Sequence, residues 1–163
     1  PFLDQKALYD KFHLDEHWDS PHNKGLLAEM PAVYAPVVSK SEERYSTYYQ
    51  VCVGEGSLFD GDRGVKLADV ADEVGMTLMV VEAAKPVPWT KPEDVTFQRQ
   101  GPPPKLGGQF EDGFYVAFAD GAARFLSGKI ASKTLHALIT RDGGEVVTFD
   151  MLGPWRRPPQ DRR

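Results

Sequence analysis

FYVAFADGAARFL, residues 114–126, is the stretch that decides the fold class, because two strand-like runs flank the pair Asp120-Gly121. Asp-Gly is the preferred pair of a two-residue type I′ turn, so we predict an antiparallel β-hairpin here. Such a turn pairs Phe118 with Ala123 and Val116 with Phe125. Alternate side chains share a face, and the apolar face should turn towards the core. The residues predicted on this face are Phe114, Val116, Phe118, Ala123 and Phe125.

Further strands are predicted on both sides of the hairpin. Residues 46–54 are rich in Thr, Tyr and Val, which favour strands. Residues 77–82 form a continuous apolar run, which is typical of a central strand buried on both faces. Residues 145–152, EVVTFDML, predict a last strand. In contrast, residues 85–108 contain six prolines in 24 residues and predict a long loop rather than a strand.

The predicted helices are short. Residues 4–12 place apolar side chains on one side at helical spacing. Ser20 as N-cap and Pro21 in the first position predict a second helix that runs to about residue 30. Ser132 is the expected N-cap of a third helix, residues 133–140. The predicted fold is α+β: an antiparallel sheet with a DG-turn hairpin, packed against two or three short helices.

Length and charge limit the classes of function. With 163 residues, the chain fits one globular domain, residues 1–152, followed by a basic, proline-rich tail, residues 153–163. The net charge of -5 argues against nucleic acid as the main partner, because phosphate binding needs a clustered positive surface. The single cysteine, Cys52, allows no internal disulfide, and its position in an apolar alternation predicts a buried, unreactive thiol.

Five segments, in this order along the chain, resemble one known family: PFLDQKALYDKF, VVEAAKPVPWTKPEDV, PKLGG, FADGAARFL and LITRDGGEVV. The family is the pseudopilin-like domain of unknown function 1559, which is processing-associated and similar to type II secretion protein G. Its hallmark is a histidine, nine residues and then Asp-Gly. Asp120-Gly121 matches, but Phe110 stands in place of the histidine, so no role of that histidine transfers. A cysteine that many members carry after the second helix is also absent, with Tyr34-Ala35-Pro36 in its place.

The resemblance implies a non-catalytic globular head of a cell-envelope or secretion-associated protein that acts in assembly or protein–protein interaction. It implies protein partners or self-assembly, and a location in the bacterial cell envelope or outside the cell on the periplasmic side. Contact with a membrane would come only through an upstream helix that this sequence lacks, and this fragment itself should be soluble. We expect the encoded precursor to contain that helix of ~20 apolar residues, preceded by a short basic leader.

One segment holds the densest set of possible metal ligands. Histidine and carboxylate side chains do ligate transition metals, often at helical or turn spacing. However, these residues directly precede the second predicted helix, where polar and acidic residues are expected without any metal. We therefore interpret the segment as a capped, solvated helix junction and predict no metal site. The residues are His13, Asp15, Glu16, His17, Asp19 and His22.

The loop Asp60-Gly61-Asp62 raises calcium as an alternative. The EF-hand pattern requires an oxygen ligand where Gly64 stands and a glycine where Val65 stands, so it does not fit. Glu55 and Asp69 lie close enough in sequence to add ligands. The alternative function is thus a surface module that binds calcium or a small ligand without polymerising. Calcium held only by the folded state would raise the melting temperature.

Catalytic signals are weak, and we predict no enzyme activity and no cofactor. The chain has no G-x-S-x-G elbow, and GEGSLFDG is not followed by the lysine of a phosphate loop. The segment Trp89 to Asp94 is the candidate interaction site. Rigid aromatic side chains between prolines bury area at low entropic cost, which favours Trp89 as an anchor with Pro92, Glu93 and Asp94 beside it. The alternative is that Trp89 folds back onto the edge of the core.

Overall fold

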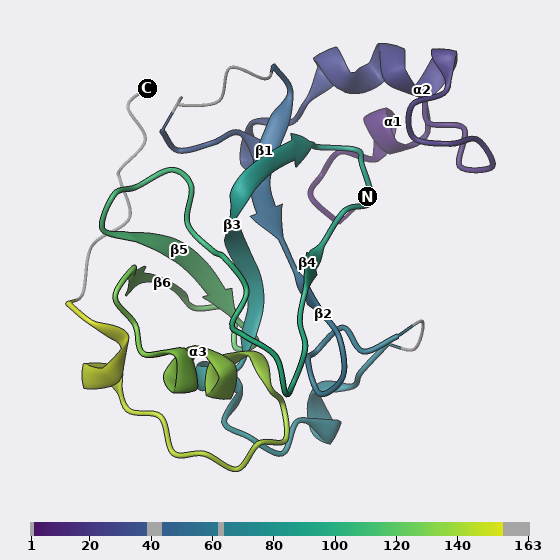
Figure 1. The fold of residues 1–163 in the computed structure, drawn as a ribbon. Coiled ribbons are helices and arrows are strands. Elements are labelled where there is room, and N and C mark those ends of the chain that lie inside the picture. The colour runs from purple at the N-terminus through teal and green to yellow at the C-terminus, as the bar shows by residue number, and fades with distance from the viewer. Residues whose placement is uncertain (1, 39–43, 62–63, 155–163) are drawn as a thin grey trace.

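The computed structural model describes residues 2–38, 44–61 and 64–154 and confirms the predicted α+β class. An antiparallel sheet has the strand order β1-β3-β5-β6, and β2 and β4 form a small parallel pair beside it (Figure 1). The strands are β1 Ser46–Gln50, β2 Cys52–Val53, β3 Leu78–Pro88, β4 Val95–Thr96, β5 Gly113–Phe118 and β6 Ala123–Ser127. The helices are α1 Lys6–Tyr9, α2 Pro21–Gly25 and α3 Ser132–Ile139, and short 3₁₀ turns lie between the other elements.

The core lies between α3 and one face of the four-stranded sheet. From α3, Leu135, Leu138 and Ile139 point into it as predicted. The helix begins one residue earlier than expected, with Ala131 rather than Ser132 at the N-cap position and no side-chain cap. The sheet and the loops around it supply the rest of the cluster: Cys52, Met76, Leu78, Val81, Phe97, Phe114, Val116, Phe118, Leu126 and Leu152.

The β5–β6 hairpin is present, but its predicted register is wrong by one residue. Ala117 pairs with Ala123, and Tyr115 pairs with Phe125. The amide of Phe118 donates to the carbonyl of Ala122, and that of Gly121 donates to Phe118, so three residues rather than two form the loop. In a common three-residue hairpin loop, the last residue is a glycine at positive φ that forms a β-bulge. Gly121 takes this position and has φ 85°.

The extra loop residue changes which side chains of β6 face the core. Since side chains alternate along a strand, a shift of one residue moves each of them to the opposite face. Leu126 of β6 therefore lies opposite Phe114 in the core. Phe125 instead packs edge-to-face against Tyr115 and Phe110, at ring-centre distances of 5.0 and 5.7 Å, on the other face.

The central strand is longer than predicted. β3 lies between β1 and β5, as expected for residues 77–82, but it continues through Pro86 to Pro88. The amide of Trp89 donates to the carbonyl of Tyr45, so along this part of β3 alternate N–H groups face β1. Pro86 and Pro88 occupy the intervening positions, whose nitrogens face away from β1. Prolines at these two positions therefore remove no hydrogen bond to β1, and the strand can include them. The prediction that all of residues 85–108 form a loop was wrong.

The last predicted strand, residues 145–152, does not form. Strand pairing within the described residues does not include this segment, which instead ends in a 3₁₀ turn, Phe149–Leu152. The carboxylate of Asp72 accepts the amides of Gly143 and Gly144 at 2.8 and 2.9 Å, which directs the chain away from the sheet. Val146 is 83% exposed, so the apolar alternation of this segment does not correspond to a buried strand face.

Two short helices precede the sheet. α2 begins where predicted, because the Ser20 hydroxyl accepts the amide of Asn23 at 3.1 Å, and a 3₁₀ turn, Leu26–Glu29, continues the helical path. α1 is shorter than residues 4–12 and buries none of its side chains. Among residues 2–38, Asn23 alone is buried. This region therefore lies on the sheet with little core of its own.

Replacing Gly121 with valine should destabilise the fold by about 1–3 kcal/mol, because a β-branched residue is strained at positive φ. A Cβ at this position meets open space, so strain alone would be responsible. Gly64→Val is the matched control, since Gly64 also faces open space and has no positive φ. Urea denaturation of both variants measures the difference. Equal stability of the two variants would contradict the proposed turn.

Candidate functional site

Trp89 follows β3 directly and packs against the N-terminal helical region. Its indole N–H donates to the carbonyl of Leu27 at 3.0 Å. Its ring stacks on Tyr34 at 5.5 Å between centres and meets the edge of Phe12 at 5.8 Å. Trp89 has thus folded back, but it stays only partly buried. It forms the floor of a groove that is lined by residues distant in sequence.

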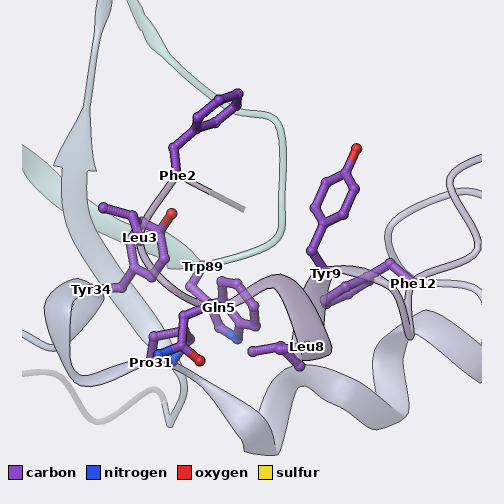
Figure 2. Close-up of a pocket in the computed structure, with 9 residues that line it drawn as sticks. All are labelled: Phe2, Leu3, Gln5, Leu8, Tyr9, Phe12, Pro31, Tyr34 and Trp89. Carbon is purple, nitrogen blue, oxygen red and sulfur yellow. The ribbon is translucent and has the colours of Figure 1, made fainter.

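The groove around Trp89 has a volume of about 490 Å³. Figure 2 shows Trp89 in its centre, with Tyr34 and Pro31 on one side and Leu8 and Phe12 on the other. Apolar side chains at its entrance are unusually exposed: Phe2 is 99% and Tyr9 is 42% exposed. We call this surface the aromatic groove, and its lining residues are Phe2, Leu3, Gln5, Leu8, Tyr9, Phe12, Pro31, Tyr34 and Trp89.

Two ion pairs lie beside the aromatic groove. Lys6 and Asp10, one turn apart on the rim, form an ion pair at 2.7 Å. Lys11 reaches Glu29 at 2.5 Å and so connects the end of the first helical turn to the turn after α2. These two pairs neutralise four of the charges on α1 and beside it. The lining residues themselves carry no charge, so the groove is suited to an apolar occupant rather than to an ion.

The other members of the predicted interaction site lie elsewhere. Pro92, Glu93 and Asp94 are exposed and do not line the aromatic groove. Glu93 forms an ion pair with Lys91, and a carboxylate oxygen of Asp94 accepts the amide of Val51 at 3.4 Å. These residues form the turn that leads into β4. The structure thus separates Trp89 from the three residues that follow it in the motif.

The histidine-rich segment forms a hydrogen-bonded junction. The rings of His13 and His22 stack in parallel, with centres 3.6 Å apart and an interplanar angle of 4°. Nitrogen lone pairs lie in the ring plane, so two stacked rings cannot direct them at one metal ion. Hydrogen bonds from Ser20 and then from His13 lower the pKa of Glu16. Within the residues that the structure describes, no group of three or more His, Cys, Asp or Glu side chains could hold a metal ion.

In the loop considered for calcium, Asp60 has protein partners. Its carboxylate accepts the amide of Gly56 at 3.2 Å and pairs with Arg141 at 3.3 Å. Arg141 also donates to the carbonyl of Ser57, so these contacts connect the loop to the segment after α3. Asp62, the second predicted ligand, lies outside the described residues. The calcium alternative remains a prediction.

A buried carboxylate is the site that the sequence analysis missed. Glu82 lies on the central strand β3 and is 0% exposed. Its carboxylate accepts the side-chain amide of Gln109 at 2.7 Å and the backbone amide of Tyr115 at 2.8 Å. Burial raises the pKa of Glu82 to about 7, and the hydrogen bond from Tyr115 partly offsets this rise. A charged residue at the end of an apolar run was the only signal in the sequence.

Comparisons of the chain with known protein families, with curated proteins and with solved structures found no match. The resemblance to the pseudopilin-like family therefore remains a hypothesis. In the described part of the chain, no helix combines the length and the apolar character needed to cross a membrane.

Cys52 should react with a thiol reagent only after the protein is unfolded. It is buried in the core, and burial, with a smaller contribution from the Asp94 carboxylate, raises its pKa to about 12. The thiolate is the reactive form, so both access and ionisation limit the reaction. Labelling with a chromogenic disulfide should be slow in buffer and stoichiometric in denaturant. Rapid stoichiometric labelling of the folded protein would contradict this assignment.

The ionisation of Glu82 should make stability depend on pH. Because folding raises its pKa from about 4.5 to about 7, the folded state binds the proton more tightly. This contribution to stability is complete below about pH 4.5 and is lost as the pH rises through about 7, a change on the order of 3 kcal/mol.

The test is urea denaturation of wild type and Glu82→Gln at several pH values. The glutamine cannot ionise, so the difference in unfolding free energy between the two proteins should change across this pH window. Any constant offset reports altered hydrogen bonds rather than ionisation. A difference that stays flat from about pH 4 to pH 8 would show that Glu82 has an ordinary pKa.

Proposed function

We propose that this domain is a non-catalytic binding and assembly module, the globular head of a pseudopilin-like cell-envelope protein. Its aromatic groove receives an apolar segment of a protein partner. The observation that carries the proposal is the groove itself, in which Trp89, Tyr34 and Phe12 face an open space with an uncharged, mostly apolar lining. Large exposed apolar patches on a folded domain mark interaction sites.

The composition of the groove favours a protein segment as the occupant. Aromatic side chains dominate the energetics of protein interfaces, because they bury much area and lose little conformational entropy. Trp89 is already fixed by its bond to Leu27 and its stacking on Tyr34, so it is ordered before a partner arrives. An amphipathic helix or an extended strand could place one or two apolar side chains over it.

The resemblance to the pseudopilin-like family supports the assembly role. Heads of that kind act beside an apolar helix, in filaments or in secretion-associated complexes. The groove would give such a head a site for the apolar side chains of a neighbouring chain. The envelope location and the self-assembly follow from this resemblance and are part of the proposal.

Photo-crosslinking in cells that produce the full-length protein tests this function. A benzoylphenylalanine at Tyr9 reports on the groove, and the same residue at the exposed Val146 is the matched control. We expect light to yield one discrete protein adduct from position 9 and none from position 146. The mass of the adduct distinguishes a second copy of this chain from another protein.

The variant Leu8→Arg gives the test its specificity. Leu8 lines the groove but belongs to α1, which buries none of its residues, so the fold should tolerate the change. An arginine places an unpaired charge against the apolar partner and should reduce the adduct about tenfold. Unchanged crosslinking in a variant that melts like wild type, or equal adducts from positions 9 and 146, would refute the proposed docking site.

A further inference from the structure

Glu82 connects three segments that are separate in sequence. Its backbone carbonyl accepts the amide of Gly107 at 2.8 Å. Its carboxylate holds Tyr115 of β5 through the backbone amide, and Gln109 through the side chain. Gln109 is itself buried, and its side-chain oxygen accepts the amide of Val38 at 3.0 Å. The chain of bonds therefore runs from residue 38 through Gln109 to the centre of the sheet.

The direction of each hydrogen bond in this chain is determined. The backbone amide of Val38 can only donate, so the side-chain oxygen of Gln109 must face it. The NH₂ group of Gln109 then faces Glu82. The amide of Tyr115 also donates to Glu82. An ionised carboxylate accepts both donors, so the arrangement in the structure fits the ionised form.

Protonation of Glu82 conflicts with this arrangement. A carboxylic acid carries a hydroxyl group, which requires an acceptor when it is buried. Of the two groups that bind the carboxylate within the described residues, the amide of Tyr115 has no acceptor to offer. Gln109 can supply its oxygen only if its amide group rotates by half a turn. After that rotation, the NH₂ group faces the amide of Val38, and the bond between them is lost.

We propose that Glu82 and Gln109 form a protonation-dependent latch that holds residues 37–38 on the sheet when Glu82 is ionised and releases them when it is protonated. Val37 lines an apolar cavity of about 230 Å³ together with residues of the sheet, among them Val80 and Ala117. Release of residues 37–38 widens this cavity. The latch is distinct from the aromatic groove and does not depend on the function proposed above.

The surroundings of Glu82 place its titration near neutral pH. Tyr49 lies opposite it on β1, and the pKa of Tyr49 is raised by burial and by the Glu82 charge. Tyr115 is the neighbour on β5, while residues 107–110 and 36–38 contribute no ionisable side chain. The ion pairs formed by the described residues do not include Glu82. The pKa of about 7 thus reflects burial, which the hydrogen bond from Tyr115 only partly offsets.

Nuclear magnetic resonance of the wild-type protein tests the latch without any substitution. The carboxyl carbon of Glu82 should titrate near pH 7. Across the same range, the exchange of the Val38 amide, corrected for its intrinsic pH dependence, should become faster at low pH by on the order of fivefold, the effect of losing one hydrogen bond. The Gln109 side-chain amide signals should shift with the same midpoint.

Two variants separate the latch from general effects of pH. Glu82→Gln carries an NH₂ group in place of the hydroxyl, so it mimics the protonated form and should keep Val38 exchange fast at every pH. Glu111→Gln removes an exposed carboxylate two residues from Gln109 and should leave the wild-type behaviour unchanged. A Glu82 midpoint below about pH 5, or Val38 exchange that does not follow the Glu82 titration, would overturn the proposal.

Discussion

Glu82 lies on the central strand of the sheet, and its carboxylate binds two segments that are distant in sequence. β1 lies on one side of it, β5 on the other, and the loop before β5 crosses over it. A buried ionised group is costly without hydrogen-bond partners, and here two N–H donors from separate segments offset part of that cost. The position of Gln109, and through it the position of residue 38, follows from this requirement. One polar side chain thus organises the face of the sheet that α3 does not cover.

Local signals in the sequence identified most elements but not their exact pairing. The Asp-Gly pair marked the hairpin, yet it occurs both in two-residue turns and in three-residue turns that end at a glycine with positive φ. The side chain of Asp120 accepts the amide of Ala122 at 2.8 Å, which stabilises the longer loop. The alternation of apolar residues in 114–126 does not by itself distinguish the two registers. The choice is made by the packing of Leu126 in the core and of Phe125 among aromatic side chains on the opposite face.

The sequence predicted even less of the candidate sites than of the strand pairing. Trp89 could be selected from sequence, because a tryptophan between prolines is an unusual surface residue. Its partners Phe12 and Tyr34 could not, since they come from segments more than fifty residues away. Glu82 was interpreted as the end of an apolar run, and its importance depends on Gln109, which lies in a different loop. Contacts of this kind are set by tertiary structure, on which hydrophobic periodicity carries no information.

The N-terminal region is held to the sheet in a way that suits a binding role. Its one buried residue, Asn23, bonds the backbone of His13 and His17, so polar contacts rather than apolar burial fix the path of the chain. Trp89 then joins this region to the end of β3. Regions with few buried apolar contacts open more readily than the core to which they are attached. The walls of the aromatic groove can therefore adjust to the proposed partner while the sheet and α3 stay folded. Such an adjustment would break polar contacts of the N-terminal region rather than contacts in the core.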